Sequence, residues 1–274
     1  MGIELNRMKT LFFTCVLAVS FFGFYSCEKV IDVPLNDADR EIVVEAIGRN
    51  FLGESYILLS RSGSVYDDGG FERLSGAVVS VTDGDGNVFI FVEDLTDPGR
   101  YVSFDFVAQP STQYSLSVNV EAQLITATSS SLSTPVLDSL TYINTGGAFG
   151  GSPTDTSYLV FYNFVDNVDE TNFYQVSAWV NGVKDDNFYI GNDVLGNGQL
   201  ASAPLFGTDV RPKDTLFVEL LSMDEAAYTY LSTLSSNINA GPFSATPANP
   251  VSNLNQGVGL FSVYMVDTMT IILP

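Results

Sequence analysis

The residues of this chain that could do chemistry are mainly carboxylates, because the sequence contains no histidine. Without histidine, neither a Ser-His-Asp triad nor a Cys-His pair can form, and the common zinc sites lose a usual ligand. The 274 residues carry 11 Lys and Arg against 32 Asp and Glu, for a net charge of −21. Such a surface repels phosphate backbones, so we expect no nucleic-acid partner.

One acidic loop has a composition that suits a hard cation. Residues 83–87 read Asp-Gly-Asp-Gly-Asn, and carboxylate oxygens on a tight loop are the ligands that Ca²⁺ prefers. An EF-hand loop starting at Asp83 would need Gly at its sixth position and Glu at its twelfth, where this chain has Val88 and Asp94. Apolar runs flank the loop, which favours a hairpin turn over a calcium site. We therefore predict no metal site and no cofactor.

Two further acidic pairs could in principle hydrolyse a glycosidic bond, which needs two carboxyl groups at a defined separation. The pairs lie at 67–68 and 185–186, both in turn-like contexts that favour solvated loops. A Ser-Lys dyad is also disfavoured, because the one Ser-x-x-Lys spacing, from Ser26 to Lys29, straddles the cleavage site proposed below. We predict that the protein is not an enzyme and has no catalytic residues.

The aromatic residues are the candidates for ligand contact. Trp179 falls on the polar side of its predicted strand, opposite Val176 and Val180, while Tyr66 and Phe71 flank the acidic loop at 67–68. Exposed aromatic rings on β-sandwich modules often bind sugars or peptides. Either set could instead pack between two domains, and the sequence leaves both interpretations open.

The first 26 residues are predicted to be a lipoprotein signal peptide. Arg7 and Lys9 form a basic start, and residues 11–25 are apolar or small. At about 1.5 Å per residue this run spans about two thirds of a hydrocarbon core, which suits a signal better than a membrane span. Translation could begin at Met1 or at Met8, since either start preserves the signal.

Cys27 is the predicted lipidation site. Ser26 places a small residue directly before this cysteine at the end of the apolar run, which is the logic of a lipobox. Cleavage would discard Cys15, the other of the two cysteines, and leave Cys27 without a disulfide partner. Two or three acyl chains, palmitate among them, anchor a protein firmly in a bilayer. An ordinary secretory signal with an incidental cysteine is the alternative.

After a tether at residues 27–40, the chain is predicted to form a mainly β fold. Residues 41–131 hold six or seven short strands, among them a period-two segment at 114–120. This size and pattern predict an immunoglobulin-like or transthyretin-like β-sandwich. Hydrophobic residues make up 46% of the sequence, enough to build a core.

The Ser/Thr-rich stretch 129–135 ends in proline and is the predicted domain boundary. Residues 136–274 are predicted to form a second β-rich domain, with a central strand at 158–165 and a hairpin turn at Asn181-Gly182. One helix is predicted near 223–236. Ser222 and Glu225 have the spacing of a capping box at its start.

Several blocks in the mature chain resemble the sequence pattern of one bacterial family. They are residues 27–32, 42–46, 58–62, 75–81, 241–243, 248–250, 252–254 and 257–261. The last four blocks, from 241–243 to 257–261, carry most of the resemblance, with a Pro, a Ser-Asn pair and a Gly-x-Gly-x-Phe in succession. Their order and spacing resemble the Bacteroidota outer-membrane lipoproteins catalogued as domain of unknown function 4249, over nearly all of residues 27–265.

The resemblance implies an outer-membrane lipoprotein with an N-terminal immunoglobulin-like domain. Such proteins are often encoded beside TonB-dependent receptors, so the implied role is accessory or binding work in nutrient uptake. The cell surface is the favoured side of the membrane over the periplasmic face. The family supplies no catalytic residues. A structural or adhesive envelope lipoprotein is the first alternative, and a hydrolase that uses carboxylates alone is the second.

Overall fold

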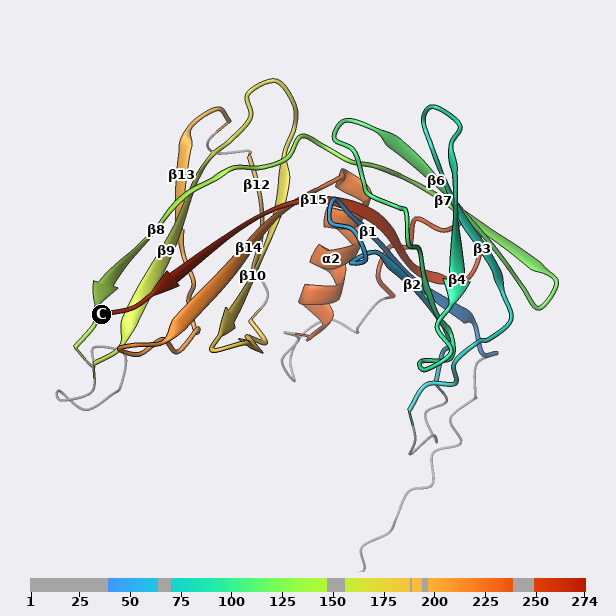
Figure 1. The fold of residues 1–274 in the computed structure, drawn as a ribbon, viewed down its shortest axis with the longest axis horizontal. Helices are drawn as coiled ribbons and strands as arrows, with labels where there is room; N and C mark the ends of the chain where they lie inside the picture. Colours follow the sequence, from blue (N-terminus) through green and yellow to red (C-terminus); the bar gives the residue numbers. More distant parts are fainter. Residues whose placement is uncertain (1–38, 64–69, 147–155, 188, 194–196, 239–248) are drawn as a thin grey trace, which may run out of the picture. The chain divides into compact units, whose positions relative to one another are not determined.

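One long strand near the C-terminus, β15 (Val258–Ile272), connects the two halves of the fold. At about 3.3 Å per residue its 15 residues extend for about 50 Å. Its first half pairs in parallel with β1 (Ile42–Arg49), and its second half pairs antiparallel with β14 (Thr215–Met223). Figure 1 shows β15 running from the strands around β1 to those around β14. We call the β1 side the N-lobe and the β14 side the C-lobe.

The computed structural model describes residues 39–63, 70–146, 156–187, 189–193, 197–238 and 249–274. Residues 39–274 form one compact unit, which contains both lobes. The predicted signal peptide, Cys27 and the tether up to residue 38 lie outside the described residues. No helix within the described ranges is long and apolar enough to cross a membrane.

The N-lobe is formed by seven strands together with the first half of β15. The strands are β1, β2 (Tyr56–Arg61), β3 (Val78–Asp83), β4 (Val88–Glu93), β5 (Arg100–Val102), β6 (Gln113–Val120) and β7 (Gln123–Ser130). They follow the order β15-β1-β2-β5-β4-β3-β6-β7. The alternation predicted for 114–120 is confirmed, since Tyr114, Leu116, Val118 and Val120 are all buried. Phe106 lies within this core, and its ring centroid is 5.1 Å from that of Phe89 and 5.5 Å from that of Tyr114.

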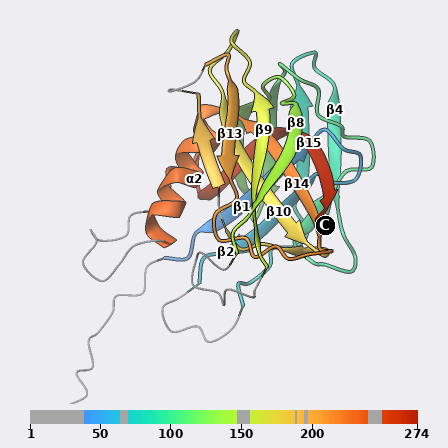
Figure 2. The same ribbon diagram turned by 90° about the vertical axis from the view of Figure 1, so that its left-hand side faces the viewer.

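The C-lobe is a sandwich of two sheets. One sheet continues from β15 through β14 to β10 (Phe173–Val180), with the short strands β11 (Val183–Lys184) and β12 (Tyr189–Asn192) beside it. The other sheet has the order β13-β9-β8, formed by Leu200–Pro204, Tyr158–Val165 and Leu137–Asn144. Figure 2 shows this three-stranded sheet in front of β10 and β14.

Two strand predictions for the C-lobe are confirmed. The strand at 158–165 is central in its sheet, because β13 and β8 pair with its two edges. Asn181 and Gly182 form the β10–β11 turn with φ angles of 52° and 82°. Positive φ at both central residues is what a type I′ hairpin turn requires. The fold is therefore mainly β, as predicted.

The helix α2 (Glu225–Ile238) packs against the sheet, but the predicted capping box is wrong. Strand β14 continues to Met223, so Ser222 lies in the sheet, where its hydroxyl donates to the carbonyl of Ser133. The chain leaves the sheet at Asp224, and Oδ1 of this residue accepts a hydrogen bond from the Ala227 amide at 2.9 Å. Asp224 is therefore the N-cap.

Two glycines at the start of β15 allow the strand to lie against β1. A Cβ atom on Gly259, which has φ +135°, would lie 1.9 Å from the carbonyl oxygen of Val44. A Cβ on Gly257 would lie 2.6 Å from that of Ile42. Nearby, the Asn253 side chain exchanges two hydrogen bonds with the backbone of Phe261. Two of the blocks that carry the family resemblance, 252–254 and 257–261, thus hold the junction between β15 and the N-lobe.

The predicted domain boundary at 129–135 covers the last two residues of β7 and most of its connection to β8. The predicted second domain, residues 136–274, ends with β15, whose first half contributes Phe261 and Val263 to the N-lobe core. The two lobes therefore share a strand, and a boundary drawn in sequence assigns all of that strand to one side.

Candidate functional site

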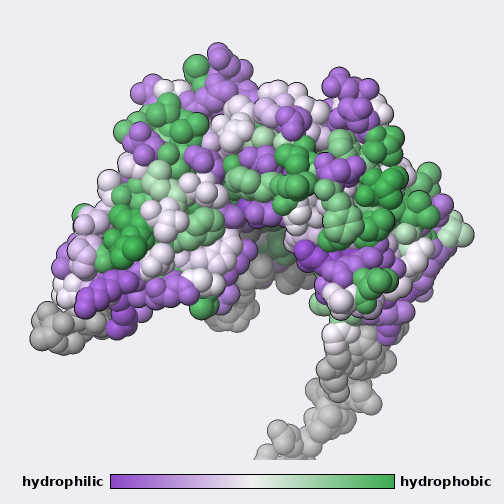
Figure 3. Space-filling view, viewed as in Figure 1, coloured by the Kyte–Doolittle hydropathy of each residue, from purple (hydrophilic) through white to green (hydrophobic). Residues whose placement is uncertain are grey.

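A cavity of about 420 Å³ lies between α2 and the sheet, where the two lobes meet. We call it the sheet–helix cavity. Seven elements contribute to its lining: β1, β2, β10, β11, β14, β15 and α2. The residues are Val43, Val44, Glu45, Ile47, Arg49, Tyr56, Gln175, Ser177, Trp179, Lys184, Glu219, Leu221, Tyr230, Leu231, Leu234, Leu260 and Tyr264. Figure 3 shows the surface hollowed between the lobes. Small-ligand sites fall in this range of volume.

Strand alternation explains why polar residues of β10 face this cavity. Gln175, Ser177 and Trp179 line it, while Val176 and Ala178 point the other way into the C-lobe core. Successive side chains of a strand point to opposite faces, so the two sets separate. Trp179 therefore lies on the face that the sequence pattern predicted.

Trp179 is held by neighbours on both adjoining strands. The ring of Phe217, its partner on β14, lies 5.3 Å away between ring centroids. Nζ of Lys184, its partner on β11, lies 5.4 Å from the centroid of the indole ring. Aromatic and cation–π contacts of this kind fix the orientation of a ring. The indole is thus a positioned group in the lining of the cavity.

An ion pair joins the two lobes across the cavity. Nη2 of Arg49 on β1 donates to Oε1 of Glu219 on β14 at 2.7 Å. The side chains are 18% and 10% exposed, so water screens the pair far less than it screens a surface pair. Nε of Arg49 also lies 3.3 Å from Oε2 of Glu54. The guanidinium therefore lies between two carboxylates.

Three tyrosines around the cavity keep their hydroxyl protons to high pH. Burial raises the pKa of Tyr264 to about 12. Burial, and then the hydrogen bond that Tyr56 donates to Glu45, raise the pKa of Tyr56 above its ordinary value. Burial and the charge of Glu45 raise the pKa of Tyr230. All three rings are neutral at physiological pH and can donate hydrogen bonds.

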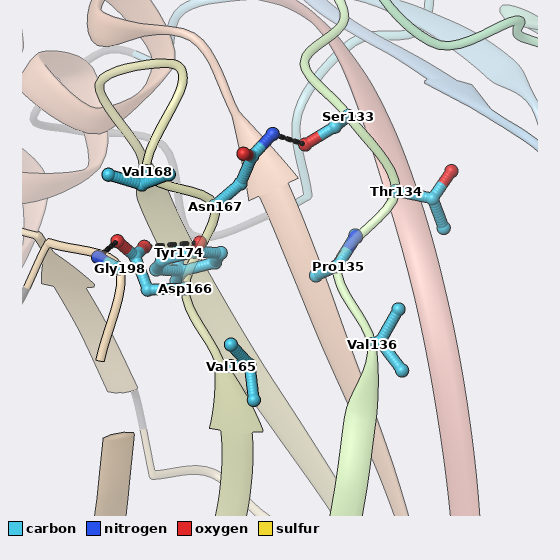
Figure 4. A pocket seen from close by; sticks show the side chains of 10 residues that line it. All are labelled: Ser133, Thr134, Pro135, Val136, Val165, Asp166, Asn167, Val168, Tyr174 and Gly198. Carbon is cyan, nitrogen blue, oxygen red and sulfur yellow. Dashed lines mark hydrogen bonds between the residues drawn. The ribbon is translucent and has the colours of Figure 1, made fainter. Parts of the chain in front are cut away.

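A second cavity of about 470 Å³ opens between the β7–β8 connection and the end of β9. Figure 4 shows Asp166 inside it, bonded to Tyr174 and Gly198. The Tyr174 hydroxyl donates to Oδ1 at 2.6 Å, and the Gly198 amide donates to Oδ2 at 2.8 Å. Both oxygens of this buried carboxylate are engaged by the protein itself. We interpret the network as structural, because it joins β9, β10 and the segment before β13.

The acidic loop at 83–87 is the β3–β4 turn. Oδ1 of Asp83 accepts hydrogen bonds from the amides of Asp85 and Asn87, at 3.0 and 2.8 Å. Oδ2 accepts a third bond from the Asn87 side chain, and that bond is the main reason why the pKa of Asp83 lies below its ordinary value. The carboxylate closes its own turn, as Asx turns do.

The other sequence candidates do not converge on one place. In the pair at 185–186, Asp185 accepts from the Asn187 amide and from the Thr208 hydroxyl, which is a loop-closing role. Phe71 is 70% exposed and does not line the sheet–helix cavity. Cys27, Tyr66 and the pair at 67–68 lie outside the described residues.

Sequence reasoning missed Arg49 and Glu219. They are separated by 170 residues, and each reads locally as a charged residue on an alternating strand. Glu219 offered a signal, since it interrupts the apolar run of β14 between Val218 and Leu220. An acidic residue inside such a run is a reason to look for a buried partner.

The fold and the cavity define a class: a two-lobed β-sandwich protein with a cavity at the lobe junction. Two solved structures show a distant similarity to the chain. The chain is 15% identical to the FN1–FN3 domains of chicken CNTN1, with a TM-score of 0.26. The match covers 84% of this chain and 64% of the CNTN1 fragment. It therefore spans less than two thirds of that fragment. For a two-domain fibronectin type-III segment of chicken tenascin the identity is 13% and the TM-score 0.22, with 67% and 91% covered.

The family follows from sequence. The profile of the family described as domain of unknown function (DUF4249) matches residues 28–270, which is most of the chain, and the protein belongs to this family. The predicted membership of domain of unknown function 4249 is thereby confirmed. No curated protein matches the sequence.

Proposed function

We propose that this protein is a non-enzymatic, lipid-anchored outer-membrane protein that assists a TonB-dependent receptor in nutrient uptake by direct contact. The observation that carries the proposal is Cys27, which directly follows Ser26 at the end of the apolar run at 11–25. A single mature cysteine in this position is explained by acylation. The anchored body stands off anionic headgroups, because its own net charge is strongly negative.

The geometry of the described residues supports work by contact. The sheet–helix cavity carries aromatic rings, hydrogen-bonding groups and a paired Arg and Glu, which is how ligand sites are commonly equipped. Two of the four charged groups that line the cavity, Arg49 on the N-lobe and Glu219 on the C-lobe, bond to each other. A protein of this design binds a ligand or partner and presents it to a neighbour.

The anchor is tested by metabolic labelling with palmitate. The native protein should incorporate label, and Cys27→Ala should abolish it, because Cys27 is the cysteine at the predicted lipobox. Cys15→Ala is the matched control and should label normally. Label that persists in Cys27→Ala would show that the anchor assignment is wrong.

The partner is tested by crosslinking intact cells and capturing the native protein. We expect a TonB-dependent barrel among the crosslinked products, and protease treatment of intact cells should remove the protein if it faces outward. Recovery of no such barrel would contradict the receptor role. An altered envelope after gene deletion, with normal growth on every nutrient, would favour a structural or adhesive lipoprotein instead.

A further inference from the structure

The sheet–helix cavity differs from the rest of the surface in its charge balance. The chain carries 32 acidic and 11 basic residues, yet the cavity is lined by two of each: Glu45 and Glu219 against Arg49 and Lys184. The most buried of these groups, Arg49 and Glu219, are bonded to each other. A charged ligand would have to approach a group of its own sign and compete with that pair. A ligand without net charge would leave the pair intact.

The hydrogen-bonding groups of the cavity are side chains rather than backbone. The site lies on strands that are paired along both edges here, since β14 lies between β10 and β15, and β1 lies between β15 and β2. A peptide that binds by strand addition needs a free edge with unpaired amides and carbonyls. The cavity therefore favours a ligand that is read by side chains alone.

Aromatic and polar groups line the cavity together, which suits an amphipathic ring. Trp179 on β10 is held by its contacts, and Tyr230 and Tyr264 contribute rings from α2 and β15. Gln175 and Ser177 share the face of Trp179 along β10. Sugar rings present C–H groups on their faces and hydroxyl groups at their rims. The C–H groups can pack on the aromatic rings of the cavity, and the hydroxyl groups can bond to its carboxylate and amide groups.

We propose that the sheet–helix cavity binds a neutral carbohydrate, with a sugar ring against Trp179 and hydroxyl groups bonded to Gln175 and Glu219. The bond to Arg49 uses Oε1 of Glu219, so Oε2 can accept a hydrogen bond from a sugar hydroxyl. Hydrogen bonds to an ionised carboxylate are shorter and stronger than neutral ones. The inference rests on the proposed uptake function, for which it names the class of cargo.

Trp179 makes the test direct, because it is the only tryptophan in the sequence. The full-length lipoprotein in detergent is titrated with maltotriose, cellobiose, chitobiose and mannobiose while tryptophan fluorescence is recorded. Glucose 6-phosphate and triglycine serve as anionic and peptide comparators. We expect a saturable change with at least one neutral saccharide and none with the comparators. No change with any saccharide up to about 10 mM, well above a 1 mM dissociation constant, would overturn the proposal, as would a response to a comparator alone.

Variants locate the binding. Measured by calorimetry, Gln175→Ala should weaken binding of the responding saccharide about tenfold, equivalent to about 1.4 kcal/mol, and Trp179→Ala should weaken it further. Trp179→Phe retains a ring and should bind in between. Phe71→Ala, which removes an exposed ring elsewhere, should bind as the native protein does. Native affinity in Gln175→Ala and Trp179→Ala, with unfolding temperatures unchanged, would overturn the assignment.

The receptor proposal can fail separately. If a barrel co-purifies but no saccharide binds, the cargo inference is wrong and the receptor role stands. If a saccharide binds with the expected variant pattern but no barrel is captured, the cargo inference stands and the receptor role is wrong.

Discussion

The interiors of the two lobes are built from different side chains. In the N-lobe, the buried polar residues among those described are all serines, and the core is aliphatic and aromatic. The C-lobe instead buries carboxylates and amides, including Asp166, Asn163, Asn172 and Glu219. A serine hydroxyl finds a backbone partner easily, whereas a buried carboxylate needs several positioned donors. The N-lobe therefore depends on packing, and the C-lobe depends on packing and on specific polar networks.

This difference indicates a division of labour. The N-lobe aligns β1 and thereby places Arg49, and the C-lobe supplies Trp179, Gln175 and Glu219 to the cavity. Buried polar groups are costly unless satisfied, so a lobe that carries them is the better place to look for recognition.

Packing in the N-lobe gives the largest expected effect. Phe106 is 1% exposed and contacts Phe89, Phe91 and Tyr114. Phe106→Ala should lower the free energy of unfolding by about 3–5 kcal/mol through lost burial and a residual cavity. Phe104→Ala, two residues away and 79% exposed, should change it by less than about 0.5 kcal/mol. Equal effects in urea unfolding would contradict the packing account.

The Asp166 network tests the dependence of the C-lobe on polar contacts. Asp166→Ala leaves the Tyr174 hydroxyl and the Gly198 amide without their acceptor, and should cost about 3 kcal/mol in the free energy of unfolding. Tyr174→Phe removes one donor and leaves the Gly198 bond in place, so it should cost less, about 1 kcal/mol. A smaller loss in Asp166→Ala than in Tyr174→Phe in urea unfolding would refute this ordering.

The Arg49–Glu219 pair tests the link between the lobes. Glu219→Ala leaves a largely buried guanidinium with one carboxylate fewer and should cost about 2 kcal/mol. Arg49→Met combined with Glu219→Leu replaces both charges with apolar groups of similar size, and should be within about 1 kcal/mol of the native protein. Chemical unfolding distinguishes these cases. A double variant that is less stable than Glu219→Ala would show that the Arg49–Glu219 interaction itself stabilises the junction. The absence of an unpaired buried charge would then not be enough.

The buried tyrosines predict sensitivity to alkali. Burial raises the pKa of Tyr264 to about 12, so folding favours the protonated hydroxyl. This contribution to the free energy of unfolding is fully present below about pH 10 and is lost as the pH rises through about 12. At pH 11, about 1 kcal/mol of it has been lost. Tyr264→Phe should therefore lose about 1 kcal/mol less stability than the native protein between about pH 8 and pH 11. Identical losses in the two proteins would contradict the direction of the shift.

Local patterns predicted much of the fold. The alternation at 114–120, the Asn181-Gly182 turn and the apolar run at 158–165 each depend on neighbours in sequence, and each was confirmed. The parallel pairing of β1 with β15 could not be predicted from such local patterns. It joins residues more than two hundred positions apart, such as Val43 and Val258, and no local signal encodes such a partner.

The candidate site was predicted only in part. Strand period placed Trp179 on the correct face, because that property is local. The partners of Trp179 across the cavity come from β1, β2, β15 and α2, and only the tertiary arrangement brings them together. The cap of α2 shows the same limit. Ser222 and Glu225 have capping-box spacing, but pairing with β10 and β15 extends β14 through Met223 and moves the start of the helix.

The proposed contact between this protein and its ligand lies in the cavity at the lobe junction. The most direct measurement follows the single indole N–H signal of Trp179 by ¹H–¹⁵N NMR while the neutral saccharides are added. We predict that the signal shifts saturably as the responding saccharide is added. In Gln175→Ala the affinity obtained from this shift should be about tenfold weaker. An indole signal that stays fixed while other resonances shift would place the contact elsewhere and contradict the account.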